Sequence, residues 1–135
     1  MIGSLDLERE RLLASASDAA SRAWCPYSRF PVGAALLIED GQIVQGCNVE
    51  SASYGLTCCA ERAAVFCAVA QGYRKGDFAA LAIYTPGNQA VSPCGACRQV
   101  LLEFLGPDAP VWAGCDGSNR LYWTIGDLLP DGFCL

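Results

Sequence analysis

The segment Val32–Ile38 constrains the fold most, because its sequence VGAALLI is apolar throughout. Successive side chains of a β-strand point to opposite faces of the sheet. A sheet that contains this strand must therefore be covered on both faces. Phe78–Tyr84 and Pro110–Gly114 are further short apolar segments with the composition of buried strands. The sequence thus predicts a central sheet enclosed between helices.

Helical and extended patterns alternate along the rest of the chain. Residues 5–24 place apolar side chains from Leu5 to Ala23 on one helical stripe, and the prolines of CPYSRFP end that helix. Such alternation indicates an α/β fold, which we expect to be a three-layer αβα sandwich with a mixed five-stranded sheet in one domain, residues 1–135. The other predicted elements are helices Ala60–Gln71 and Cys94–Leu105, strands Gln42–Val49 and Arg120–Thr124 (an edge strand), a hairpin at Glu39–Gly41, and a helical turn around Asp127–Leu129.

The helix at Ala60–Gln71 contains eight consecutive apolar residues, Ala63–Ala70. A helix that is apolar on every side has to be buried on every side. One face of a small sheet cannot cover all of it. We therefore expect that other subunits cover the remainder.

Composition excludes several classes of protein. With 53% hydrophobic and 17% charged residues, the chain is not expected to be disordered. No apolar run reaches the length of a membrane-spanning helix, and the opening MIGSLDLERE does not resemble a secretory signal. We expect a cytoplasmic protein without a membrane partner.

The net charge and the absence of histidine limit the partners and the kinds of catalytic site that the chain can have. The net charge is −5 and the nine Lys and Arg residues are scattered, which argues against a nucleic-acid partner and favours small neutral substrates. The sequence contains no His. A Ser-His-Asp triad, a Cys-His dyad and a His-ligated metal therefore cannot be built from one chain.

The chain is rich in cysteine, and in two segments the cysteines have a spacing that is typical of metal-binding or redox sites. The nine Cys are odd in number and lack a secretory context, so we expect no disulfide framework and treat most as small buried apolar residues. The exceptions lie in TCCAER at 57–62 and SPCGACRQ at 92–99. Cys94 and Cys97 fall on one face of a first helical turn, where the helix N-terminus lowers thiol pKa values. The same CxxC spacing also occurs in dithiol redox proteins.

Cys59 begins one predicted helix as Cys94 begins another. If both helix N-termini point to one spot, Cys59, Cys94 and Cys97 surround a Zn²⁺ ion. Three protein ligands leave the fourth tetrahedral position open, which is typical of a catalytic zinc, whereas a structural zinc requires a fourth ligand. A redox protein would instead form a Cys94–Cys97 disulfide under mild oxidation.

Two charged residues follow Cys59 in the same helical turn. Three thiolates give the zinc site a net negative charge, which Arg62 and the helix N-termini can offset through hydrogen bonds to sulfur. Glu61 can exchange protons with water at the open position. The alternatives are a surface arginine for Arg62 and, for Glu61, an acid that complements the helix dipole.

Four segments together resemble the homotetrameric cytidine deaminases. They are PYSRFPVGAAL at 26–36, GCNVESASYGLTCCAERAA at 46–64, SPCGACRQVLLEF at 92–104 and LLPDGF at 128–133. The resemblance implies Cys59, Cys94 and Cys97 as zinc ligands and Glu61 as the proton shuttle. It also implies the fold of that family and hydrolytic deamination of cytidine and 2′-deoxycytidine to the uracil nucleosides and ammonia, in pyrimidine salvage.

The same resemblance implies substrate contacts and pockets that are shared between subunits. Ser51 departs from the family, which commonly has Asn at that position, and the chain lacks a charged tail after Phe133. The implied contacts are Asn48 and Glu50 with the ribose hydroxyls, Phe30 at the pyrimidine and ribose wall, the Ala60 backbone N–H with the base carbonyl, and Tyr54 and Phe133 from neighbouring subunits.

These residues also have interpretations that involve no substrate. Asn48 and Glu50 would then be solvated residues at the end of a strand, and Phe133 would be a disordered or surface-covering terminal residue. A related deaminase acting on another cytosine nucleoside, such as blasticidin S, is the nearest alternative function. A polynucleotide-editing deaminase is disfavoured by the acidic charge.

Overall fold

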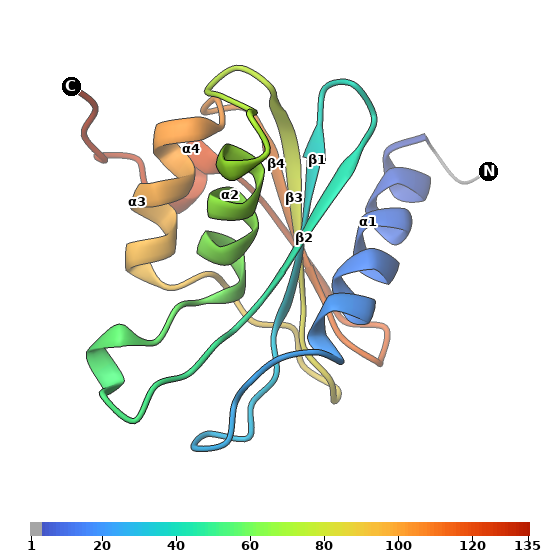
Figure 1. Ribbon diagram of the computed structural model, residues 1–135. Helices are drawn as coiled ribbons and strands as arrows, with labels where there is room; N and C mark the ends of the chain where they lie inside the picture. The colour runs from blue at the N-terminus through green and yellow to red at the C-terminus, as the bar shows by residue number, and fades with distance from the viewer. Residues whose placement is uncertain (1–3) are drawn as a thin grey trace.

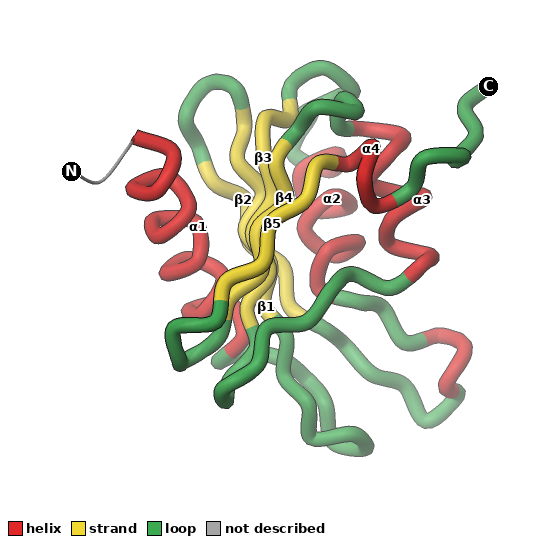
Figure 2. The backbone as a smooth tube through the Cα atoms, turned by 180° about the vertical axis from the view of Figure 1, so that it is seen from behind, coloured by secondary structure: helices red, strands yellow, loops and turns green. Residues whose placement is uncertain are grey.

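A five-stranded sheet forms the middle layer of the protein, in a computed structural model that describes residues 4–135. Helix α1 covers one face, and α2, α3 and α4 cover the other (Figure 1, Figure 2). The strand order is β2-β1-β3-β4-β5; β3 and β4 are parallel neighbours, and the other neighbouring strands in this order are antiparallel. The predicted three-layer α/β fold with a mixed sheet is confirmed.

The elements agree with the predicted ones in number and type, apart from a short 3₁₀ turn in a segment expected to be loop. The strands are β1 Gly33–Ile38, β2 Ile43–Cys47, β3 Phe78–Tyr84, β4 Pro110–Gly114 and β5 Arg120–Thr124. The helices are α1 Ser4–Ala20, α2 Ala60–Ala70, α3 Gly95–Phe104 and α4 Ile125–Leu128, and the 3₁₀ turn is η1 Tyr54–Leu56. Within residues 4–135, no helix is both long and apolar enough to cross a membrane.

Strand β1 is buried along its whole length, as its sequence predicts. Ala34 and Leu36 point into the core beneath α2, together with residues from β3, β4 and α3. Ala35 and Leu37 point the other way, into a smaller core against α1. The alternation of the strand therefore divides the apolar side chains between two cores, one on each face of the sheet.

The first helix is shorter than predicted. α1 ends at Ala20, whereas the apolar spacing suggested residue 24, and Leu5 is 69% exposed rather than part of the core. Beyond the helix, the Trp24 N–H donates to the Asn48 carbonyl (3.0 Å) and the Glu50 N–H donates to the Trp24 carbonyl (2.8 Å). These bonds hold the chain extended beside the segment that follows β2. Periodicity alone cannot anticipate such a non-local partner.

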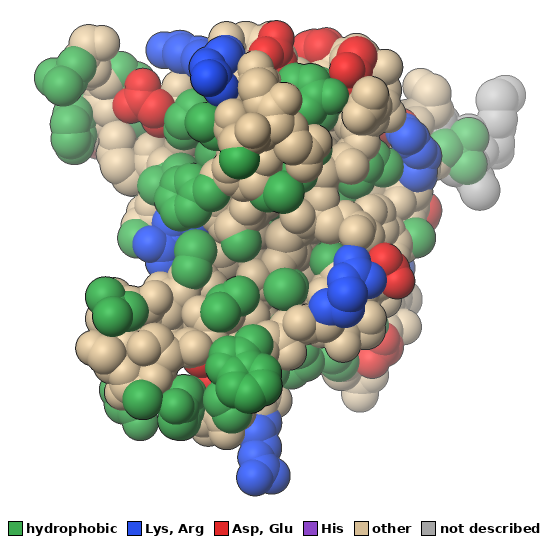
Figure 3. Space-filling model, viewed as in Figure 1, with side chains coloured by type: hydrophobic (Ala, Val, Ile, Leu, Met, Phe, Trp, Pro, Cys, Tyr) green, Lys and Arg blue, Asp and Glu red, His purple; other side chains and the backbone are tan. Residues whose placement is uncertain are grey.

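The outer side of α2 carries exposed apolar side chains. Phe66 is 51% exposed and Cys67 is exposed as well, whereas Ala64 and Ala68 are fully buried against the sheet. In Figure 3, hydrophobic side chains gather on the face that carries α2 and η1. The sheet covers only the inner side of this helix, so coverage of the outer side by other subunits stays a prediction.

Gly46 in β2 allows α2 to lie directly on the sheet. A Cβ atom at this position would be 2.4 Å from the Ala64 nitrogen and 2.5 Å from the Ala60 carbonyl oxygen. Both are backbone atoms, so a side chain at position 46 cannot be accommodated by a rotamer change. The contact fixes the height of α2 above the sheet and thereby the position of Cys59 at its start.

We predict that Gly46→Ala lowers the free energy of unfolding by about 1–3 kcal/mol, because α2 must move away from β2. Urea denaturation of the purified variant measures this loss. Gly106→Ala is the matched control, since a Cβ at Gly106 meets no heavy atom within 4 Å. Equal stability of both variants would contradict the close packing described here.

Candidate metal centre and adjoining cavity

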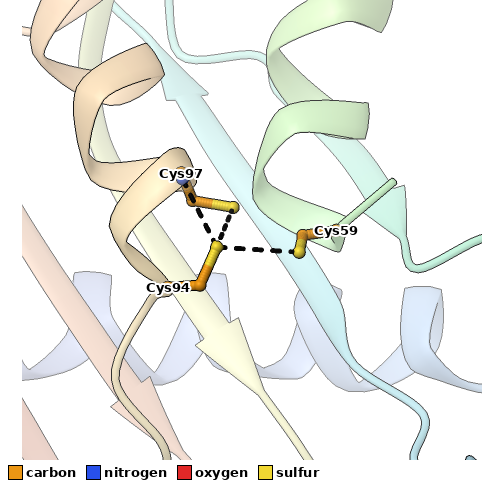
Figure 4. A group of neighbouring side chains, drawn as sticks. All are labelled: Cys59, Cys94 and Cys97. Carbon is orange, nitrogen blue, oxygen red and sulfur yellow. Dashed lines mark hydrogen bonds between the residues drawn. The ribbon is translucent and has the colours of Figure 1, made fainter. Parts of the chain in front are cut away.

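Three sulfur atoms from two helix N-termini converge on one point (Figure 4). Cys59 is the N-cap residue of α2, Cys94 is the N-cap residue of α3, and Cys97 lies in the first turn of α3. The Sγ atom of Cys94 is 3.8 Å from that of Cys59 and 3.4 Å from that of Cys97. The structure thus brings together the three sulfurs that the sequence predicted as ligands.

The spacing of the sulfurs fits a tetrahedral zinc ion. A Zn–S bond of about 2.3 Å places two ligands of a tetrahedron about 3.8 Å apart, close to the observed distances. The Sγ atoms of all three residues lie within 4.8 Å of one another. Thiolate is a ligand that Zn²⁺ prefers, and the Cys97 N–H donates to the Cys94 sulfur (3.4 Å), which stabilises negative charge there. The donor set and its spacing therefore fit Zn²⁺.

No fourth metal-ligating group joins this cluster among residues 4–135. The neighbouring Cys58 is not a member, and its thiol contacts the Cys59 carbonyl at 3.6 Å. Burial raises the pKa of the Cys58 thiol, which disfavours the thiolate form that a metal requires. Three ligands are what a catalytic zinc site uses, whereas a structural site uses four.

The pKa values of the Cys59 and Cys97 thiols are shifted in opposite directions. Hydrogen bonding with Cys97 is the main cause that lowers the pKa of Cys59 to about 5, and the Arg62 guanidinium contributes to the same shift. The pKa of Cys97 is raised by its hydrogen bond to Cys59 and by its burial. The thiolate form is therefore favoured at Cys59, at the start of α2.

Arg62 lies against this negative charge. Its Nη2 atom is 3.5 Å from the Cys59 sulfur, and the hydrogen bond to Cys59 raises the pKa of the guanidinium. Its Nε atom is buried and has no partner among the described residues. The placement differs from that of an exposed surface arginine, because the cation is directed at the sulfur cluster.

Glu61 is the buried acid of the site. Only 4% of the residue is exposed, although it belongs to the first turn of α2. Burial raises the pKa of its carboxyl group above the usual value. An acid in the first turn that served only the helix dipole would gain more from exposure as a charged group. The buried position instead suits a carboxyl group that gains and loses a proton.

A cavity of about 470 Å³ opens beside the sulfurs. A space of this size is typical of small-molecule sites. The predicted residues Phe30, Asn48, Glu50, Cys59, Ala60, Glu61 and Cys94 line it, together with Ser28, Val32, Thr57, Ile83, Val91 and Ser92. The lining combines apolar side chains with two carboxyl groups and one amide.

The amide of Asn48 is partly committed to its own chain. Its Oδ1 atom accepts from the Val32 N–H (2.9 Å), and its Nδ2 atom donates to the Phe30 carbonyl (2.8 Å). One N–H of the amide remains to donate to a ligand in the cavity. Asn48 therefore both holds the segment that carries Phe30 and presents a donor.

Glu50 is held by the segment that precedes Phe30. The backbone N–H groups of Tyr27 (3.0 Å) and Ser28 (3.1 Å) donate to Oε1, and the Ser28 hydroxyl donates to Oε2. The hydroxyl of Ser28 is the main cause that lowers the pKa of this carboxyl group. Glu50 thus presents an ionised acceptor to the cavity.

Ala60 contributes its backbone to the cavity. As the first residue of α2, it has an N–H group without an acceptor inside the helix. Such a group can donate to a carbonyl oxygen of a ligand.

Two predicted residues do not line this cavity in their own chain. Tyr54 in η1 is 76% exposed and packs edge-on against Tyr27, with ring centroids 6.1 Å apart. Phe133 is 68% exposed, and its carbonyl accepts a hydrogen bond from Gln99 (2.9 Å). The structure places both rings at the surface of the chain.

The sequence did not single out Ser28, Thr57 or Ser92, which also line the cavity. Serine and threonine have no spacing pattern that marks a binding role. The available signals were positional: Ser28 lies two residues before Phe30, and Thr57 and Ser92 begin the two cysteine-containing segments.

Taken together, the fold and the sulfur cluster define an α/β protein with a three-cysteine zinc-binding centre. A family model described as "Cytidine and deoxycytidylate deaminase zinc-binding region" matches residues 7–112. The chain belongs to this cytidine and deoxycytidylate deaminase family.

Individual relatives agree with this assignment. A cytidine deaminase from Sporosarcina psychrophila is 46% identical over 127 residues, covering 94% of this chain and 92% of the relative. The crystal structure of a cytidine deaminase from Burkholderia pseudomallei superposes with a TM-score of 0.88 at 48% identity, covering 92% of this chain and 98% of that chain. A blasticidin-S deaminase from Bacillus cereus is more distant, at 31% identity over 73% of this chain and 74% of the relative.

We predict that Arg62→Met lowers the affinity for Zn²⁺ by about 10–100-fold, because the Cys59 thiolate loses its cationic partner. Competition with a chromophoric chelator measures the affinity. Arg74→Met is the control, since Arg74 follows the far end of α2 and its guanidinium donates to the Val69 and Tyr73 carbonyls. An unchanged affinity in Arg62→Met would show that the arginine has no effect on the metal.

Proposed function

We propose that the protein catalyses the zinc-dependent hydrolytic deamination of cytidine and 2′-deoxycytidine to uridine and 2′-deoxyuridine, with release of ammonia, in pyrimidine salvage. The observation that carries this proposal is the three-sulfur cluster beside a buried carboxyl group, at the edge of a cavity of nucleoside size. The activity named for the relatives described above supports the same substrate.

Cys59, Cys94 and Cys97 hold the zinc ion in this proposal. When bound, the ion acts as a Lewis acid that makes water nucleophilic at neutral pH. The main task of Arg62 and the two helix N-termini is to offset the charge of the three thiolates.

Glu61 moves the protons that the reaction requires. Addition of water at C4 of the pyrimidine releases one proton, which N3 takes up. When the C4–N bond then breaks, the C4 hydroxyl releases a second proton, which the departing amino group takes up as ammonia. A single buried carboxyl group with a raised pKa can accept and donate each of these protons in turn, so acid and base are the same residue.

The remaining residues orient the nucleoside. Glu50 accepts a hydrogen bond from a sugar hydroxyl, and the free N–H of Asn48 donates to the sugar. The Phe30 ring forms an apolar wall, and the Ala60 N–H donates to the carbonyl of the base. These roles place the sugar beside Glu50 and Asn48 and the 4-amino group toward the sulfurs.

The electrostatics of the cavity favour a nucleoside over a nucleotide. Among the described residues that line the cavity there is no Lys or Arg, and two of them are acidic, Glu50 and Glu61. A phosphate group would meet a negative field without a cationic partner. Deoxycytidylate, the other substrate in the family description, is therefore disfavoured. The alternative substrate is the nucleoside blasticidin S, which the same absorbance assay can compare with cytidine.

We further propose a homotetramer whose pockets are completed by Tyr54 and Phe133 of neighbouring subunits. Both rings are exposed in the subunit, and the apolar outer side of α2 offers a surface for association. We expect the 135 residues to act as one domain, without a nucleic-acid or membrane partner. The nine free thiols suit the reducing conditions of the cytoplasm.

Glu61→Gln removes the proton carrier while it preserves size and burial. We expect kcat to fall by about 10²–10⁴-fold, with one zinc per chain and an unchanged melting temperature. Ultraviolet absorbance follows the loss of cytidine, and metal analysis gives the zinc content. Glu103→Gln, at an exposed position of α3, is the control. Full activity of Glu61→Gln would exclude the proposed proton transfer.

Sharing of pockets between subunits is tested by complementation. We expect Phe133→Ala and Glu61→Gln to be impaired alone, and co-expressed chains to regain part of the activity. Mixed assemblies contain pockets with an intact Glu61 from one subunit and an intact Phe133 from another. Light scattering gives the mass of each assembly. A monomeric mass, or no recovery in the mixture, would contradict the proposal.

A further inference from the structure

The hydroxyl of Ser28 lies between two groups of the cavity that face the sugar in the proposed function. The Phe30 N–H donates to its oxygen at 3.0 Å, and the hydroxyl itself donates to Oε2 of Glu50. One side chain thus links the backbone of the aromatic wall to the carboxylate. Both linked residues line the cavity, and so does Ser28.

The turn around Ser28 is shaped for this double contact. Arg29 has φ of 55°, a left-handed conformation that side chains other than glycine adopt at a cost. The Arg29 N–H donates to the Cys25 carbonyl at 2.9 Å, and the backbone N–H groups of Tyr27 and Ser28 both donate to Glu50. The reversal at Arg29 returns the Phe30 N–H to the Ser28 side chain. Arg29, the strained residue, therefore lies between the two residues that its turn brings into contact, Ser28 and Phe30.

The donors around Glu50 leave little of its acceptor capacity free. An ionised carboxylate offers about four lone-pair sites. The two N–H groups occupy Oε1 and the Ser28 hydroxyl occupies one site of Oε2. The remaining site on Oε2 has a direction set by the Ser28 bond. A ligand hydroxyl that binds there is consequently oriented relative to Phe30.

We propose that Ser28 is a positioning residue that aligns Glu50 and Phe30 as one unit for recognition of the sugar. The proposal rests on the proposed nucleoside deamination. Ser28 acts through Glu50, so its loss weakens binding of the sugar and leaves proton transfer by Glu61 in place. Loss of a hydrogen bond to a charged group corresponds to about a tenfold change in binding.

The test is a kinetic comparison on the zinc-loaded full chain. We expect Ser28→Ala to raise KM for cytidine about tenfold with kcat changed less than about twofold, and Ser28→Thr, which keeps the hydroxyl, to restore KM to within about threefold of the wild type. Ser118→Ala, in the exposed loop between β4 and β5, is the matched control and leaves both constants unchanged. If Ser28→Ala fails to fold, Ser28→Cys replaces it, because a thiol is a weak donor.

A second arm distinguishes positioning through Glu50 from a general structural effect. In a Glu50→Gln background, we expect Ser28→Ala to raise KM by a further factor of less than about two, because the carboxylate that Ser28 orients is already absent. An unchanged KM in Ser28→Ala, or a full tenfold rise in the Glu50→Gln background, would overturn the inference while wild-type activity stands. Zinc-loaded wild-type protein that leaves cytidine unchanged would overturn the proposed function and the role of Ser28 with it.

Discussion

The structure depends on the meeting of two helix N-termini at one point. Each helix contributes a cysteine at its N-cap, and α3 adds a second sulfur one turn along, so the sulfurs are close only while α2 and α3 lie correctly on the sheet. Gly46 fixes α2 against β2, and the parallel pair β3 and β4 is joined by a crossover that carries α3. The site is therefore a consequence of packing as much as of ligand chemistry.

In the proposed function, the residues around the cavity have two separate tasks. We assign the control of charge and protons to the sulfurs, Arg62 and the buried Glu61. We assign recognition of the sugar to Glu50, Asn48 and the turn around Ser28, whose hydrogen-bonding groups are held by the chain itself. Chemistry and recognition can consequently respond to different substitutions.

Much of this could be predicted from the sequence, and the limits have physical causes. Apolar strands and the cysteine spacing predicted the sheet, its helical layers and the three sulfurs, because they depend on local pattern and simple ligand chemistry. The end of α1 was misplaced since Trp24 pairs with the distant Asn48. Ser28 was missed because its contacts with Glu50 and Phe30 depend on a left-handed turn that composition does not reveal.

We propose that three sulfurs of this chain, and no other protein group, bind one zinc ion. X-ray absorption spectroscopy at the zinc edge of the purified protein measures which atoms surround the ion and at what distance. We expect three sulfur neighbours at about 2.3 Å and one lighter neighbour at about 2.0 Å. A spectrum with four sulfur neighbours would identify a closed structural site, and one with fewer than three would show that the cluster does not hold the metal.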